Sequence, residues 1–155
     1  MNWANIGWWV AYACIAIVLQ SRAPGLDFLL PGFILAIQER NGAQFLWVAV
    51  FFLLLQEGMG NMAFGGTLLW YALAVFLFRL GHNLFEAESF LFIFLLSGCL
   101  GVTHYLVFSI MAGLQGIPVH PQTLMDESVF QALFTPFLWR LAYYSRRFIH
   151  REDRA

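Results

Sequence analysis

The sequence predicts an all-α, polytopic integral membrane protein with about six transmembrane helices, two of them short. Of its 155 residues, 61% are hydrophobic and only 11% are charged, with a mean hydropathy of +0.70. A soluble domain usually has about a quarter of its residues charged. Because a domain of this size buries only about two-thirds of its surface, so much apolar side chain is incompatible with water as the solvent. The composition therefore indicates that the protein is surrounded by lipid.

Glycine, proline and charged residues divide the chain into six apolar segments. The segments are residues 3–20, 26–38, 43–56, 62–78, 89–114 and 129–144. A helix needs about twenty apolar residues to span a bilayer, so the second and third segments are short. They are either short helices that thin the bilayer or a re-entrant pair buried against the other helices. The segments form a single transmembrane domain, 1–148, followed by a basic cytoplasmic tail, 149–155.

The arginines predict the orientation of these helices. The chain has no lysine, and with both termini in the cytoplasm only Arg22 falls in an outer loop. The inner side then holds the other arginines, which are Arg40, Arg79, Arg140, Arg146, Arg147, Arg151 and Arg154. Cytoplasmic loops carry the excess of positive charge in membrane proteins, so we expect an N-in, C-in, multi-pass protein of the bacterial inner membrane. The basic C-terminus is interpreted as this flank, and no nucleic acid is expected as a partner.

Small residues recur every four positions in the fifth segment. Ser97, Gly101, Ser109 and Gly113 surround Tyr105 at this spacing, which predicts that they share one face of a helix. Small side chains let neighbouring helices approach closely in a bilayer, where no hydrophobic drive pulls helices together. We therefore expect a packing seam here, formed either within the chain or with a partner.

Polar residues within the apolar segments are the candidates for chemistry, because they are costly in lipid. His104 lies deepest, and we expect it to be hydrogen-bonded within the protein. The alternative is a haem held by His104 and His82, although the loop position of His82 puts the two imidazoles at different depths. Asp27 and Glu57 lie at segment ends on the predicted outer side, where we expect water to solvate them. Capping a helix and meeting a partner's cation are the alternatives for these two carboxylates.

The sequence contains no recognisable catalytic machinery. It has no nucleophile–base–orienter set, no phosphate-binding loop and no spaced cluster of metal ligands. Its two cysteines, Cys14 and Cys99, each lie in an apolar run without a CxxC pattern. We expect neither an enzymatic activity nor a bound cofactor or metal.

Four stretches of the chain have features of a known family. Residues 23–30 (APGLDFLL) form a proline-plus-polar entry into the second segment, and 53–58 (LLLQEG) are a leucine run that ends in an acidic residue. Residues 60–66 (GNMAFGG) form a small-residue turn, and 132–138 (ALFTPFL) place a proline in the last segment before an Arg-Arg exit. Together these features resemble the rod shape-determining protein MreD family, whose members are short chains with five or six membrane helices.

The resemblance implies a non-catalytic scaffold subunit of the machinery for cell shape and lateral wall elongation. The implied partners are membrane lipid, an MreC-like protein, and the glycosyltransferase and transpeptidase membrane subunits of the wall synthase for peptidoglycan. The family-like positions, with an architectural or interfacial role, are Glu57, Gly58, Phe64, Gly65 and Pro136. This chain departs from the family at Glu57, where Asp is more common.

Two other functions share parts of this pattern. The substrate-binding membrane subunit of a vitamin-type transporter has a similar six-helix plan and needs a polar-lined pocket near the outer face. The residues available to line such a pocket are Glu57, Asn61, His104 and Gln115. The other alternative is the membrane anchor of an oxidoreductase, which would use the histidine pair.

Overall fold

The structure is a computed structural model that describes residues 3–23, 25–59, 65–86 and 88–152, with side chains described as far as Phe148. Within these ranges it contains six α-helices and no strand. In chain order they are α1 (Trp3–Arg22), α2 (Leu30–Gln38), α3 (Gly42–Gly58), α4 (Gly66–His82), α5 (Phe90–Gln115) and α6 (Pro121–Glu152). The predicted all-α class is confirmed for the described residues, and each helix overlaps one predicted segment.

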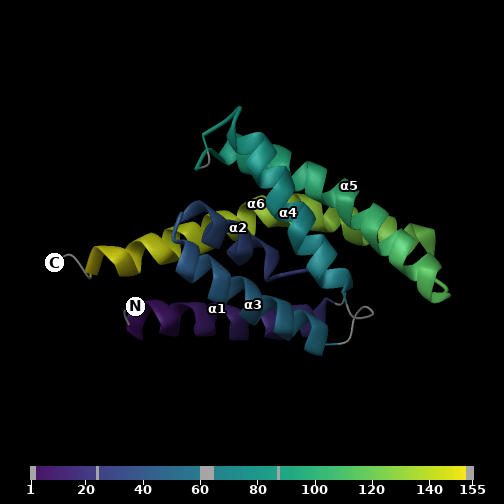
Figure 1. Cartoon of the computed structure of the whole chain (residues 1–155), viewed down its shortest axis with the longest axis horizontal. Helices are drawn as coiled ribbons and strands as arrows, with labels where there is room; N and C mark the ends of the chain where they lie inside the picture. Colours follow the sequence, from purple (N-terminus) through teal and green to yellow (C-terminus); the bar gives the residue numbers. More distant parts are fainter. Residues whose placement is uncertain (1–2, 24, 60–64, 87, 153–155) are drawn as a thin grey trace.

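Successive helices run in opposite directions through the bundle (Figure 1). As a result α1 and α3 are parallel, and paired amides join them at both ends. Asn5 Nδ2 donates to Gln44 Oε1 at 2.8 Å, and Gln20 Nε2 donates to Gln56 Oε1 at 2.8 Å. Figure 1 shows both chain termini at the Asn5 end, which we call the terminal end; the Gln20 end is the distal end.

α4 continues this alternation from the distal end to the terminal end. Near its start Trp70 Nε1 donates to the Asp27 carboxylate at 3.2 Å. At its last residue His82 Nε2 lies 3.0 Å from Arg40 Nη2, which follows the end of α2. α5 then returns to the distal end, and α6 brings the chain back.

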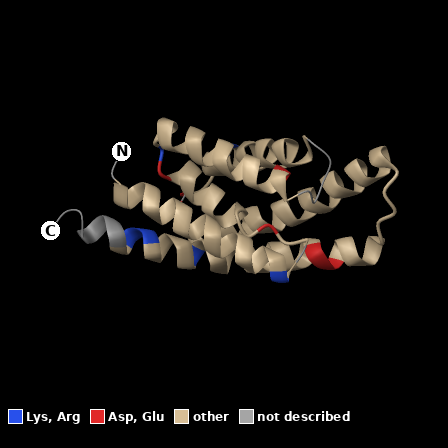
Figure 2. Ribbon diagram, turned by 90° about the horizontal axis from the view of Figure 1, so that it is seen from below, with Lys and Arg blue, Asp and Glu red and all other residues tan. Residues whose placement is uncertain are grey.

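α5 and α6 form the longest antiparallel pair, and their hairpin projects beyond α1 and α3 at the distal end (Figures 1 and 2). The hairpin turns at Gly116, whose φ of +64° is favourable only for glycine. α6 begins at Pro121 and not at the predicted residue 129. Proline is favourable in the first turn of a helix, and the added turns bury Leu124 and Ser128. These contacts explain why the polar stretch before residue 129 is helical.

The core is aromatic. Trp9 and Phe52 are fully buried, with ring centroids 6.0 Å apart in an edge arrangement. Phe33 of α2 stacks on Tyr71 of α4 with centroids 4.4 Å apart. Seven of the nine residues of α2 are buried, so this short helix is enclosed by the others.

Two of the described helices, α1 and α5, are long and apolar enough to cross a membrane, with 20 and 26 residues. α3 and α4 are apolar but have 17 residues each. Large hydrophobic side chains nevertheless point outward on these two as well, for example Leu54 and Phe76. Charged residues occupy short, separate stretches of a ribbon that is otherwise uncharged (Figure 2). Such extensive exposed apolar surface is typical of a chain that is covered by lipid or by partners.

Candidate functional site

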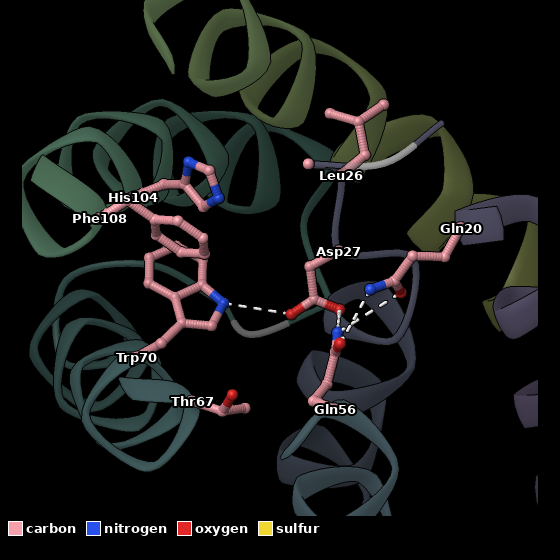
Figure 3. A pocket seen from close by; sticks show the side chains of 9 residues that line it. Gln20, Leu26, Asp27, Gln56, Thr67, Trp70, His104 and Phe108 are labelled. Atoms are coloured by element: carbon pink, nitrogen blue, oxygen red, sulfur yellow. Dashed lines mark hydrogen bonds between the residues drawn. The ribbon is translucent and has the colours of Figure 1, made fainter. Parts of the chain in front are cut away.

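The most densely hydrogen-bonded part of the interior surrounds Asp27, in the turn between α1 and α2 (Figure 3). Its Oδ1 accepts hydrogen bonds from the backbone N–H groups of Leu29 and Leu30, at 2.9 and 3.0 Å, and from Gln56 Nε2 at 2.6 Å. Its Oδ2 accepts from Trp70 Nε1 at 3.2 Å. Only 8% of Asp27 is exposed. Four N–H donors therefore replace water around the carboxyl oxygens, as burial of a polar group requires.

Gln131 on α6 holds the backbone of Asp27. Its Oε1 accepts from Asp27 N at 2.8 Å, and its Nε2 donates to Asp27 O at 3.1 Å. The same Nε2 donates to Thr135 Oγ1 at 3.1 Å, and the Thr135 hydroxyl donates back to Gln131 O at 2.6 Å. We call the whole set the Asp27 cluster: Gln20, Asp27, Gln56, Trp70, Gln131 and Thr135. It ties α1, α3, α4 and α6 to the turn before α2.

This environment overturns the expectation that water solvates Asp27. The carboxylate faces inward because the turn folds back under α6, and there the Glu127 side chain packs against Gly25, whose φ is +96°. The alternative that Asp27 caps a helix is the one observed, since Oδ1 accepts from N–H groups at the start of α2. Its contacts with Gln131 join positions 104 apart in the sequence, and local sequence carries no signal for such a pairing.

His104 borders a small cavity beside the cluster (Figure 3). Ser128 Oγ donates its one proton to Leu124 O at 2.8 Å, so His104 Nδ1 must donate in its 3.0 Å contact with Ser128 Oγ. The expected internal hydrogen bond is confirmed. In the neutral imidazole Nε2 then carries a lone pair, and this atom is buried without a hydrogen-bond partner among the described residues.

The cavity beside His104 is too small for a metabolite. Its volume is about 40 Å³, whereas pockets for drug-sized ligands measure about 300–1,000 Å³. A single water needs about 10–15 Å³ on this kind of measure. The cavity therefore has room for a few waters at most.

Those residues of the predicted vitamin site that the structure describes do not converge on one pocket. His104 is engaged by Ser128 at the cavity, whereas Glu57 lies at the end of α3. Gln115 lies at the end of α5, on the projecting hairpin. Asn61 lies outside the described residues.

The two histidines of the haem alternative also lie apart. His82 contacts Arg40 at the terminal end, while the His104 ring packs edge-on against Trp70 with centroids 5.4 Å apart. Trp70 precedes His82 by twelve positions, which is about 18 Å along α4. In the part of the chain that the structure describes, no three His, Cys, Asp or Glu side chains gather as metal ligands.

A second polar cluster lies at the terminal end and is centred on Arg146. Arg146 Nε forms an ion pair with Glu39 Oε1 at 2.6 Å, and only 3% of the arginine side chain is exposed. Nη2 donates to Glu39 Oε2 at 3.0 Å and to Asn5 Oδ1. The guanidinium also lies 5.1 Å from the ring centroid of Trp9. The Arg146 cluster comprises Asn5, Glu39, Gln44 and Arg146, and Gln44 joins it by donating to Glu39.

The buried position of Arg146 corrects its grouping with the basic flank. The sequence placed Arg146 and Arg147 together as a basic exit, but only Arg147 is exposed. α6 continues through this region to Glu152, so the predicted tail begins within a helix. Residues 153–155 lie outside the described part of the chain.

The predicted seam of small residues packs within the chain in its first half only. Ser97 and Gly101 are buried, and a Cβ added at Gly101 would lie 2.7 Å from Ala132 Cβ of α6. Ser109 and Gly113 are exposed. Each step of four residues turns about 40° around an α-helix, so positions sixteen apart point in nearly opposite directions. The expectation that all four share one face was wrong.

The positions indicated by the family resemblance have separate surroundings. Glu57 Oε1 accepts from Gly65 N at 3.1 Å and so caps the start of α4, where Gly65 has a φ of +96°. Gly58 is exposed at the end of α3, and Phe64 lies outside the described residues. Pro136 lies inside α6, which continues without a break. An interfacial role for these residues stays a prediction.

An apolar groove lies on the outside of the molecule between α5 and α6. Its volume is about 540 Å³. Three of its lining residues are small, namely Gly98, Gly101 and Ala132. The remaining lining residues are Val102, Tyr105, Met125, Ser128, Val129 and Leu133. We call this feature the α5–α6 groove.

Sequence reasoning missed the three glutamines that build the Asp27 cluster. A signal for them was present, because an amide is costly in lipid and needs a partner. Gln20 and Gln56 end the first and third segments, and Gln131 lies near the start of the sixth. With alternating helix directions, all three fall at the same end of the bundle.

Comparisons with protein families, with curated proteins and with solved structures gave no match to this chain. Function is therefore inferred from the geometry of the molecule and from the features of its sequence.

Proposed function

We propose that this protein is a non-catalytic, MreD-like scaffold subunit of the bacterial cell-shape and wall-elongation machinery, embedded in the inner membrane, where it holds partner transmembrane helices. The observation that carries the proposal is the α5–α6 groove. Its lining is mostly apolar and outward-facing, and Gly98, which has open space around it, permits the backbone of another helix to approach closely. The partners would be an MreC-like protein and membrane subunits of the wall synthase.

The contrast between the two hollows favours a scaffold over a carrier of small molecules. A vitamin-type carrier needs a pocket with convergent polar groups near the outer face, and the cavity beside Asp27, at the distal end, measures only about 40 Å³. The groove measures about 540 Å³ and lies on the outside. A hollow of this kind suits a helix or a lipid chain.

The helix directions support six membrane-crossing segments with both termini on the cytoplasmic side. Arg79 and Arg147 lie toward the terminal end of their helices, Arg40 follows the end of α2 there, and Arg22 ends α1 at the distal end. The terminal end would therefore face the cytoplasm. α2 is too short to cross alone, but seven of its nine residues are buried against neighbouring helices. This burial satisfies the rule that segments that do not span the membrane are enclosed by protein at membrane depth.

Gly98 offers the best-defined test of partner binding. It lines the groove, and a Cβ added there meets no atom within 4 Å. Gly98→Leu should fill the groove without disturbing packing inside the chain, unlike a substitution at Gly101. Gly113→Leu is the matched control, because Gly113 is an exposed glycine of the same helix that lies outside the groove and also has open space around it.

The measurement is quantitative mass spectrometry of what co-purifies with each tagged variant from its native membrane in mild detergent. We expect Gly98→Leu to lose the wall-synthesis partners, and Gly113→Leu to retain them. Equal recovery of partners from the two variants would show that the groove is not the binding surface.

A further inference from the structure

A hollow at the terminal end has a lining rich in hydrogen-bond donors. It lies between the ends of α2 and α4 and the start of α3, with a volume of about 270 Å³. Its polar and glycine lining is Gln38, Arg40, Asn41, Gly42, Arg79 and His82, and its apolar walls are Ile37, Phe45, Val75 and Phe78. We call it the basic pocket. None of these described lining residues is acidic.

The hydrogen bonding of His82 shows which nitrogen of its neutral imidazole carries the proton. A guanidinium can only donate, so His82 Nε2 is the acceptor in its 3.0 Å contact with Arg40 Nη2. In the neutral imidazole the proton is then on Nδ1, a buried atom with no hydrogen-bond partner among the described residues. The pocket therefore combines two guanidinium groups with the imidazole of His82.

The acidic residue adjacent to Arg40 in the sequence does not neutralise the positive charge of the pocket. Glu39 precedes Arg40 in the sequence, but its carboxylate is engaged by Arg146 at 2.6 Å. α3 begins at the pocket, and the N-terminus of a helix adds partial positive charge. Arg40 itself has a φ of +52°, a conformation that non-glycine residues rarely adopt. Strain of this kind is found where a side chain must be held in a particular place.

We propose that the basic pocket binds the phosphate group of an anionic phospholipid. Phosphate oxygens are acceptors, and they match arginine donors in both charge and geometry. The apolar walls fit the part of an acyl chain that adjoins the glycerol. With the terminal end facing the cytoplasm, the pocket lies at the leaflet where basic pockets between helices bind anionic headgroups. The inference requires membrane embedding but not the scaffold function.

The test measures lipid binding to the purified full-length protein by native mass spectrometry. The probe is phosphatidylglycerol, and phosphatidylcholine is the zwitterionic reference. Arg40→Asn and Arg79→Gln each remove one charge; asparagine is chosen because it tolerates the left-handed backbone. Arg22→Gln removes the same charge at the distal end and is the matched control. We expect each pocket variant to bind phosphatidylglycerol about fivefold more weakly, and the control to bind it unchanged.

Inorganic phosphate distinguishes the two possible sources of the phosphate group. Displacement of bound phosphatidylglycerol by inorganic phosphate would support a site that recognises the phosphate group. Binding of inorganic phosphate alone, with no affinity for the lipid, would overturn the assignment to phospholipid. Equal affinity for the two lipids, or full phosphatidylglycerol affinity in both pocket variants, would overturn the site.

Two features keep the result interpretable. Arg79 is exposed, so Arg79→Gln still tests the pocket if Arg40→Asn folds poorly. Gly98→Leu is assayed by partner recovery rather than by lipid binding, so failure of the lipid site and failure of the scaffold proposal are distinguishable.

Discussion

Asp27 and Arg146 are buried at opposite ends of the bundle, and their surroundings differ in kind. Arg146 has a counter-ion, since Glu39 Oε1 lies 2.6 Å from its Nε. Asp27 has none among the described residues, and its carboxylate is held by four neutral N–H donors. A charge removed from water needs either an opposite charge or a full set of hydrogen bonds. This protein has the ion pair at the terminal end and the set of hydrogen bonds at the distal end.

The two solutions should respond differently to substitution. Removing one member of an ion pair leaves the other charge without its partner, so the loss is abrupt. A shell of neutral donors loses stability in steps, one hydrogen bond at a time. Both clusters also include an amide pair between α1 and α3, so comparable substitutions are available at the two ends.

The largest effect is expected from Arg146→Met. The substitution leaves the Glu39 carboxylate without its cation, and we expect the free energy of unfolding to fall by about 3–5 kcal/mol. Reversible unfolding by sodium dodecyl sulfate in mixed micelles measures this change. Arg147→Met is the control, because Arg147 is the exposed neighbour. Adding Glu39→Gln to Arg146→Met should recover part of the loss, and strictly additive costs would contradict the ion-pair account.

Asp27 should show the stepwise behaviour. Asp27→Ala leaves four donors unpaired, and we expect it to cost about 3 kcal/mol in the same assay. Asp27→Asn can keep an oxygen in the place of Oδ1, which serves three of the four donors, so it loses one hydrogen bond of four and its cost should be about 0.8 kcal/mol. If the two substitutions were equally damaging, the carboxylate would be required for its charge and not for its acceptors.

Effects smaller than that of Asp27→Ala are expected from the amide pairs. Gln20→Leu removes a neutral hydrogen bond to Gln56, with an expected cost of about 1 kcal/mol. Asn5→Leu should cost about 2 kcal/mol, because Asn5 also accepts from the Arg146 guanidinium. The same unfolding titration compares them, and a larger loss at Gln20 would reverse the proposed ranking of the two ends.

The composition, together with the glycine, proline and charged residues that separate the apolar segments, was enough to predict the helices, since each described helix overlaps one apolar segment. They were also enough to predict an internal hydrogen bond for His104, because an imidazole deep in an apolar helix needs a partner. The arginine pattern agrees with the observed placement of both termini at one end. These features depend on residue type and on neighbouring positions, which a sequence displays directly.

The sites were harder to predict, because they depend on which helices become neighbours. Asp27 was expected in water, but its contacts with Gln131 span 104 positions. Arg146 was grouped with a basic flank, although Glu39 and two tryptophan rings enclose it. The packing seam through Gly101 was predicted over too many residues, because side chains four positions apart point in progressively different directions around the helix. Tertiary contacts decide each of these cases.

The most direct test of the scaffold account is the identity of the proteins that co-purify with the tagged wild-type chain from its native membrane in mild detergent. The account predicts recovery of an MreC-like protein together with glycosyltransferase and transpeptidase subunits of the wall synthase. Recovery of transporter ATPases, or of haem-bearing oxidoreductase subunits, in their place would contradict it.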